Sequence, residues 1–208
     1  MKILLFLITI FAFACSSEKE RQNEASYFQF SSFNIEILDT TDLFSKNLTS
    51  QILVEKIGKN NISDSTELFE EGTVEVNYSK IYPNTEKELM FFWNNNGTLK
   101  SIKLNNPISK WSVNNLKVGM TIDEILKENA KDFYVYGFGW DEGGKIYDWN
   151  NGKFSDFNDG LKVYLILNFD EFTESEIDKL SGDNITLNSS DIILKNKKII
   201  IDKIEIIF

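Results

Sequence analysis

Histidine is absent from the chain, and cysteine and arginine occur once each, as Cys15 and Arg21. Without histidine, the chain cannot carry out Ser-His-Asp hydrolysis or Cys-His catalysis, and it cannot form a histidine zinc site. A single cysteine excludes an intramolecular disulfide. Because Arg21 falls in a polar N-terminal stretch, the folded part also lacks the bidentate guanidinium clamp that commonly binds phosphate or carboxylate groups.

Positive charge is scarce as well, because 22 Lys and Arg residues stand against 32 Asp and Glu residues, for a net charge of −10. Proteins bind nucleic acids largely by neutralising phosphates with Lys and Arg. We therefore expect no nucleic-acid partner. A length of 208 residues is enough for one large domain or two small ones.

The N-terminus has the pattern of an export signal. Lys2 precedes an apolar run from Ile3 to Ala14, which is shorter than the roughly 20 residues that a membrane-spanning helix needs. The run ends in Ala12-Phe13-Ala14-Cys15, which resembles the lipobox of bacterial lipoproteins, although Phe13 and Ala12 depart from its usual residues. The resemblance implies that residues 1–14 are a cleaved signal peptide. It also implies that Cys15 carries a diacylglycerol and an N-acyl group, which together anchor a protein stably in a membrane.

Residues 15–26 are polar and lack apolar periodicity, so we expect a lipidated, flexible tether. Ser16 in place of aspartate after the cysteine is similar to an outer-membrane sorting signal. The acidic residues close to Cys15 also resemble the surface-export signal of some lipoproteins. We therefore expect an outer-membrane lipoprotein, on either the periplasmic or the cell-surface side.

The first half of the chain predicts one helix among several strands. Leu53 and Ile57 form an apolar stripe behind the capping candidates Thr49 and Ser50, and Gly58 is a plausible stop. A polar stretch follows at residues 60–65. Alternating polar and apolar residues predict strands at 33–38, 73–78, 88–93 and 98–104, the last two joined by a hairpin turn at Asn94–Gly97.

The second half repeats this order after Pro107. Two capping boxes, Thr121–Glu124 and Thr173–Glu176, predict helices. Strands are expected at 133–136, 145–149, 161–167, 191–195 and 198–208, with Leu161, Val163, Leu165 and Leu167 facing inward. The order favours an α+β fold of two tandem helix-plus-antiparallel-sheet modules, at 27–106 and 107–208, with helices packed on one face of the sheet. One continuous domain is the alternative.

The segment Leu116-Lys-Val-Gly-Met-Thr-Ile-Asp-Glu-Ile-Leu126 resembles the Gly-Met-Thr segment of BamE-type small lipoproteins and of β-lactamase-inhibitor-protein-like (BLIP-like) modules. The resemblance implies a turn that caps a helix lying on an antiparallel sheet. It bears on the fold and carries no activity with it.

Two motifs are weighed against simpler interpretations. Gly139 to Lys145 has the spacing of a phosphate loop, but Ile146 stands where Ser or Thr would hold magnesium. We therefore expect a glycine-rich turn and no nucleotide. Asp148, Asp156 and Asp159 are candidate calcium ligands, but the EF-hand pattern fails around them, and Asn-Gly and Asp-Gly pairs are typical of turns. We expect a polar loop there and no metal.

Aromatic residues are concentrated between Phe133 and Trp149. Tyr and Trp are favoured at interfaces because they combine apolar area with a hydrogen-bonding tip, but core packing is the favoured explanation, because aromatics are common in buried sheets. Four glycines between Gly137 and Gly144 predict a tight turn with positive φ. Such a turn would project Trp140 and Asp141 from the sheet, but burial of Trp140 is the favoured alternative, because large apolar side chains are more often inside. The candidate partner-binding residues are Tyr136, Trp140, Asp141 and Trp149.

The sequence thus favours a non-catalytic binding or scaffolding lipoprotein of the cell envelope that contacts a protein partner and needs no cofactor. The first alternative is a glycan-binding accessory lipoprotein that uses exposed aromatics. The second is a hydrolase with a pair of carboxylates, which can act without histidine. A flat aromatic patch would favour a protein partner, and an aromatic platform beside an open groove would favour a glycan.

Overall fold

The computed structural model describes residues 30–31, 41–69, 74–191, 193–194 and 199–208. The expected signal peptide, Cys15, the tether and the expected strand at 33–38 lie outside these residues. Within the described part, none of the helices has the length and apolar character that crossing a membrane requires.

The chain has an α+β fold whose largest element is a six-stranded antiparallel sheet in the order β2-β3-β4-β5-β11-β9. Its strands are β2 Ile62–Phe69, β3 Val74–Ile81, β4 Leu89–Trp93, β5 Leu99–Leu104, β9 Leu161–Leu167 and β11 Ile199–Ile207. A three-stranded sheet has the order β10-β7-β8, and β1 pairs with β6. These strands are β1 Phe30–Ser31, β6 Ser112–Val113, β7 Tyr134–Tyr136, β8 Ile146–Asp148 and β10 Thr186–Asn188.

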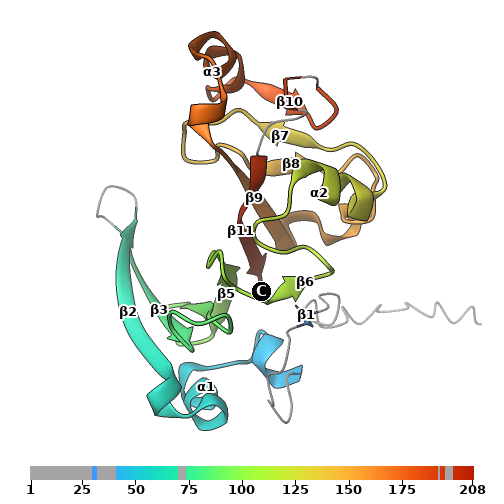
Figure 1. Cartoon of the computed structure of the whole chain (residues 1–208). Helices are drawn as coiled ribbons and strands as arrows, with labels where there is room; N and C mark the ends of the chain where they lie inside the picture. Colours follow the sequence, from blue (N-terminus) through green and yellow to red (C-terminus); the bar gives the residue numbers. More distant parts are fainter. Residues whose placement is uncertain (1–29, 32–40, 70–73, 192, 195–198) are drawn as a thin grey trace, which may run out of the picture.

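The helices lie at the ends and along the side of this framework (Figure 1). The α-helices are α1 Ser50–Ile57, α2 Ile122–Asn129 and α3 Glu174–Leu180. Short 3-10 helices are η2 Thr41–Phe44, η3 Lys59–Asn61, η4 Ser155–Gly160 and η5 Phe169–Glu171. In Figure 1, α1 lies with β2 and β3 at one end of the molecule, α3 and β10 lie at the other, and β9 and β11 run between them.

The expected helix boundaries are confirmed by their caps. Thr49 accepts a hydrogen bond from the backbone of Ile52 at the start of α1, and Gly58, with φ +83°, ends the helix. Both capping boxes are present, at Thr121 with Glu124 and at Thr173 with Glu176. Because each box satisfies backbone N–H groups that a helix start leaves unpaired, these short helices begin where the sequence places them.

The hydrophobic core draws on both halves of the chain. All four predicted inward residues of β9 are buried, as are Leu53 of α1 and Ile125 of α2. The hairpin of β4 and β5 also forms as expected, with Gly97 at φ +78° in its turn. These elements belong to one continuous core cluster.

Strand β11 connects the two halves. It pairs with β5 on one side and with β9 on the other, so one sheet contains strands from both sides of Pro107. The three-stranded sheet adjoins this sheet through a bridge between Lys145 and Tyr164. Three strands, β7, β8 and β9, are thereby placed next to one another.

Three segments differ from the sequence-based expectation. The polar stretch after α1 contains most of η3 and the start of β2. The side chains of β2 from Ser63 to Leu68 are all exposed, so buried and exposed residues do not alternate along it. The expected strand at 191–195 is wrong, because Ile193 and Leu194 lie in a turn. The short strand β10 was not predicted, and it is held to β7 by the pairing of Leu187 with Val135.

Candidate partner-binding face

Four aromatic side chains gather on one face of the three-stranded sheet, and we call them the aromatic cluster: Tyr134, Tyr136, Trp140 and Tyr147. The rings of Tyr136 and Tyr147 stack with their centroids 4.4 Å apart. Tyr134 lies 6.2 Å from Tyr147, and Trp140 meets Tyr136 edge-on at 5.7 Å. Tyr147 is 40% exposed, and the other three are half-buried. The cluster therefore presents a tyrosine-rich surface to solvent.

The glycine-rich loop after Tyr136 is a turn, as expected, with Gly139 at φ +85° and Gly144 at φ +74°. Glycine is required at Gly144 because a Cβ there would overlap the carbonyl oxygen of Leu165 in the neighbouring strand. Trp140 differs from the expectation. Its indole N–H turns back to donate to the carbonyl of Gly137 at 2.7 Å, so the ring lies against Tyr136 and does not project from the sheet. Asp141 is exposed.

Trp149, a partner-binding candidate from the sequence, lies instead in the core and is only 6% exposed. Its ring packs against Phe154 at 4.9 Å and against Phe133 at 5.7 Å. The chain turns inward here because Asn129, a fully buried side chain, donates to the carbonyl of Trp149 at 3.1 Å and accepts from the backbone N–H of Phe154 at 3.3 Å. Trp149 is therefore unavailable to a partner.

The aromatic cluster continues sideways into a row of alternating tyrosine and lysine side chains, which we call the Tyr–Lys row: Tyr136, Lys145, Tyr164 and Lys203. Tyr136 donates its backbone N–H to Lys145, Lys145 bridges to Tyr164 on β9, and Tyr164 pairs with Lys203 on β11. The ammonium of Lys203 lies 3.7 Å from the ring centroid of Tyr164, and that of Lys145 lies 5.9 Å from the ring of Tyr136. Cation–π contacts at these separations are attractive.

Glu142 contacts both residues in the middle of this row, Lys145 and Tyr164. Its carboxylate pairs with Lys145 and accepts a hydrogen bond from the Tyr164 hydroxyl at 3.3 Å. Burial opposes ionisation of Glu142, but the hydrogen bond and charge of Lys145 outweigh it, so the pKa of Glu142 lies below its ordinary value. Burial and the nearby Glu142 carboxylate raise the pKa of Tyr164, which keeps this phenol protonated as a donor.

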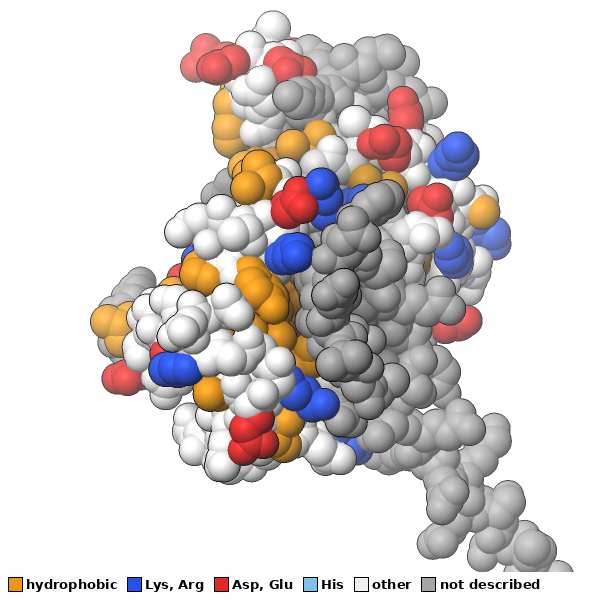
Figure 2. All heavy atoms as spheres, turned by 60° about the horizontal axis from the view of Figure 1, so that its bottom comes forward, with side chains coloured by type: hydrophobic (Ala, Val, Ile, Leu, Met, Phe, Trp, Pro, Cys, Tyr) orange, Lys and Arg blue, Asp and Glu red, His pale blue; other side chains and the backbone are white. Residues whose placement is uncertain are grey.

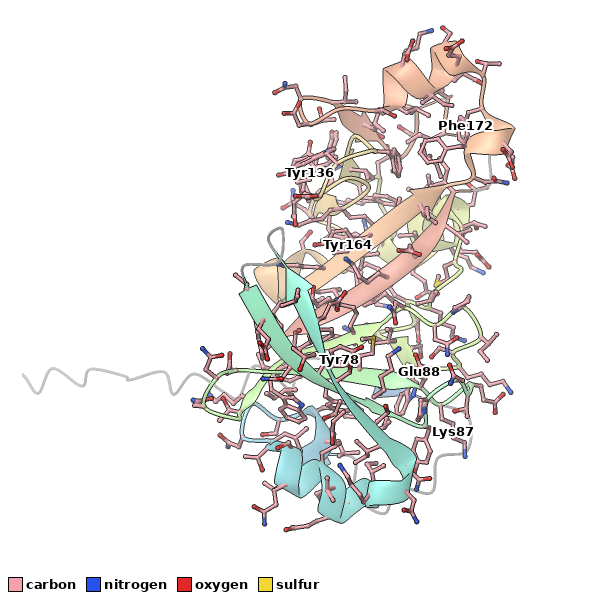
Figure 3. The ribbon with its side chains drawn as sticks, turned by 90° about the vertical axis from the view of Figure 1, so that its left-hand side faces the viewer. Tyr78, Lys87, Glu88, Tyr136, Tyr164 and Phe172 are labelled. Atoms are coloured by element: carbon pink, nitrogen blue, oxygen red, sulfur yellow. The ribbon has the colours of Figure 1, made fainter. Side chains whose placement is uncertain are left out.

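Below the row, the same face of the six-stranded sheet carries further lysine and aromatic side chains. Lys103 lies 4.2 Å from the ring centroid of Phe92, which in turn contacts Tyr78 at 5.3 Å. Ser101 donates to Glu205 at 2.8 Å. Burial lowers the pKa of Lys103, although the negative charge of the nearby Glu205 acts in the opposite direction. Figure 3 shows Tyr136, Tyr164 and Tyr78 following one another along this side of the molecule.

Tyr164 and Lys203 were not among the candidates from the sequence. The alternation of β9 carried a usable signal, because inward Val163 and Leu165 place Tyr164 on the opposite face. Lys203 gave no such signal, because a β-bulge between Ile201 and Lys203 shifts the alternation of β11.

Two of the three calcium candidates have side chains that the structure describes. Asp148 uses one carboxylate oxygen to accept the backbone N–H of Asn150 at 2.7 Å, and Asp156 is exposed. The side chain of Asp159 lies outside the description. Among the residues that the structure describes, no group of three or more acidic side chains could hold a metal ion.

The described carboxylates also bear on acid–base chemistry. Four of them have a clearly shifted pKa, and in each case the shift is downward: Asp64, Glu124, Glu128 and Glu142. A catalytic acid needs a raised pKa so that it retains a proton near neutral pH. These four groups are instead charged acceptors.

Comparison with known proteins adds no relative: no family model, curated protein or solved structure matches this chain.

Proposed function

We propose that the chain is a non-catalytic binding lipoprotein of the cell envelope, which contacts a protein partner through the aromatic cluster and through Lys145 and Lys203 of the Tyr–Lys row. Tyr164 is 8% exposed and supports Lys203 through its ring. The observation that carries this proposal is the stacked pair Tyr136–Tyr147 on the three-stranded sheet, next to Lys145, in a row that continues through Tyr164 to Lys203 on the six-stranded sheet. Tyrosine at the centre of a contact supplies large apolar area at low conformational cost, and its hydroxyl offers a hydrogen bond.

Internal contacts hold the row in place before any partner arrives. Glu142 fixes Lys145 and Tyr164, and the ring of Tyr164 supports Lys203. Binding then costs little further side-chain entropy, which is one of the main costs of association. A face that is ordered in advance is suited to recognising a folded partner.

The shape of the face favours protein over glycan. The cluster lies on paired strands of a sheet, and the groove that the structure describes beside α1 lies at the opposite end of the molecule (Figure 1). A sugar-stacking platform would be expected to border such a groove.

Membrane attachment through Cys15 completes the proposal. The expected product is an outer-membrane lipoprotein that faces the periplasm or the cell surface. Cys15→Ser should abolish lipidation, leave the precursor unprocessed by the lipoprotein peptidase and remove the protein from the outer-membrane fraction. If the variant still fractionates with the outer membrane after a high-salt wash, the anchor lies elsewhere.

The binding face is tested by chemical crosslinking of the full-length protein in its own envelope, with paired variants. Lys203→Glu, within the row, should reduce the crosslinked complex at least about tenfold, whereas Lys117→Glu, an exposed lysine outside it, should not. Tyr136→Ala should weaken binding by about 2 kcal/mol or more, as truncated interface anchors do. Equal complex in all three variants would contradict the proposal.

A further inference from the structure

A separate hollow is lined by residues of α1, β2 and β3, with Lys59 and Trp93. In Figure 1, α1 and the adjoining ends of β2 and β3 lie at the end of the molecule away from β7 and β8. Its volume is about 510 Å³, within the range of roughly 300–1,000 Å³ typical of small-ligand sites. Its lining includes Gln51, Val54, Lys59, Asp64, Ser79 and Trp93. We call it the α1 groove.

A chain of hydrogen bonds fixes one carboxylate in this groove. The indole N–H of Trp93, which is 8% exposed, donates to the hydroxyl of Ser79 at 3.0 Å. Ser79 donates to one oxygen of Asp64 at 2.7 Å, and the ammonium of Lys59 pairs with the other oxygen at 2.6 Å. The chain therefore runs from a buried tryptophan to a carboxylate whose side chain is 52% exposed.

Asp64 retains capacity to accept further hydrogen bonds. An ionised carboxylate offers about four lone-pair positions, and Ser79 and Lys59 occupy two of them. The hydrogen bonds from Lys59 and Ser79 lower the pKa of Asp64, so it is a charged acceptor at neutral pH. Two donor groups of a ligand can be accommodated at this one carboxylate.

Charge decides which ligand chemistry fits. A lone carboxylate in a chain of net charge −10 would favour a cation, but Lys59 neutralises Asp64 within the groove. Figure 2, turned so that this end comes forward, shows acidic and basic side chains dispersed among polar ones and not gathered in one charged patch. The groove therefore suits a neutral ligand with many hydroxyl groups.

The remaining lining agrees with such a ligand. Thr66 donates to the side-chain oxygen of Asn77 at 2.9 Å across β2 and β3, which places hydroxyl and amide groups along the same groove. Val54 is the only aliphatic side chain among the residues that line it. The lining also includes Tyr78 and Trp93. A sugar, which combines apolar ring faces with hydroxyl donors and acceptors, suits such a mixed lining.

We propose that the α1 groove binds a short neutral saccharide, whose hydroxyls donate to Asp64 and accept from Lys59. This site is independent of the proposed partner-binding face. Its occupancy can therefore fail or succeed without deciding the function of the Tyr–Lys row.

The test uses the indole N–H signals of the protein's four tryptophans in NMR spectra, assigned by single Trp→Phe substitutions. The protein is titrated with cellobiose, maltose and N,N′-diacetylchitobiose to about 10 mM, enough to nearly saturate a site with a Kd of about 1 mM or tighter. At least one disaccharide should shift the Trp93 signal saturably and leave Trp140 unchanged. Absence of a saturable Trp93 shift with all three would overturn the proposal.

Two substitutions locate the site. Asp64→Asn should weaken saccharide binding at least about tenfold, whereas Asp178→Asn, an exposed acid on α3, should have no effect. Lys59→Ala should weaken saccharide binding and, by uncovering the charge of Asp64, create binding of the cation spermidine. Undiminished saccharide binding in Asp64→Asn, or spermidine binding by the unaltered protein at the Trp93 signal, would contradict a neutral-saccharide site.

Discussion

The two tryptophans of the aromatic segment should differ sharply in their effect on stability. Trp149 is 6% exposed and packs against Phe133 and Phe154, so Trp149→Ala removes a large core side chain. Such truncations cost about 3–5 kcal/mol. For a domain of this size, about 2–4 °C of melting temperature is lost per kcal/mol. We expect a decrease of roughly 6–20 °C on the same scale.

Trp140→Ala removes less. The structure shows one hydrogen bond to Gly137 and one edge contact with Tyr136. A hydrogen bond contributes about 0.5–1.5 kcal/mol and an aromatic pair a similar amount. We expect a loss of about 1–3 kcal/mol, at or below the lower end of the range for Trp149→Ala.

Urea unfolding followed by far-ultraviolet circular dichroism measures both variants without relying on tryptophan fluorescence. Equal losses of stability for the two variants would mean that the Trp140 side chain also belongs to the core. A loss below about 1 kcal/mol for Trp149→Ala would refute the packing described for that side chain.

Three further outcomes follow from particular residues. Gly144→Ala should destabilise the protein much more than Gly97→Ala. Both glycines have positive φ, but only at Gly144 would the new Cβ meet a backbone carbonyl. The midpoints of urea unfolding measure both variants, and similar losses of stability would contradict the close approach of Leu165. Thr121→Ala and Thr173→Ala should each lower the free energy of unfolding by about 1 kcal/mol, because each removes a helix cap. The same urea unfolding measures this loss, and an unchanged stability would argue against the caps. The pKa of Glu142 is lowered in the folded state, so the ionised carboxylate stabilises the fold above its ordinary pKa of 4.5, and this stabilisation is lost as pH falls through the folded pKa. Glu142→Gln should therefore be less stable than the unaltered protein at pH 7, and the difference should shrink below pH 4.5. A stability difference that persists below pH 4.5 would contradict the pairing of Glu142 with Lys145.

Local signals predicted much of the fold. The capping boxes at Thr121 and Thr173 and the caps of α1 fixed the helices, because short-range hydrogen bonds determine where a helix starts. Alternation identified β9 because one of its faces is buried. The same reasoning missed β2, since its described side chains are exposed over most of its length and only pairing with β3 reveals it.

The candidate site was predicted only in part. The strand that contains Tyr136 and the glycine turn after it are present as predicted, but the position of Trp149 depends on the distant Asn129, which no local pattern reveals. Lys203 reaches the binding face because the bulge after Ile201 reverses the alternation of β11. Long-range packing and backbone irregularity, which leave little trace in a single sequence, decide both positions.

The most direct measurement of the proposed binding face is site-specific photocrosslinking in intact cells. A photoreactive phenylalanine analogue replaces Tyr147, which is 40% exposed in the aromatic cluster, or Phe169, which is 49% exposed on η5 and serves as a matched control. A contact face at the aromatic cluster should give a discrete crosslinked protein from position 147 and none from position 169. Crosslinks of equal yield from both positions, or none from position 147, would contradict it.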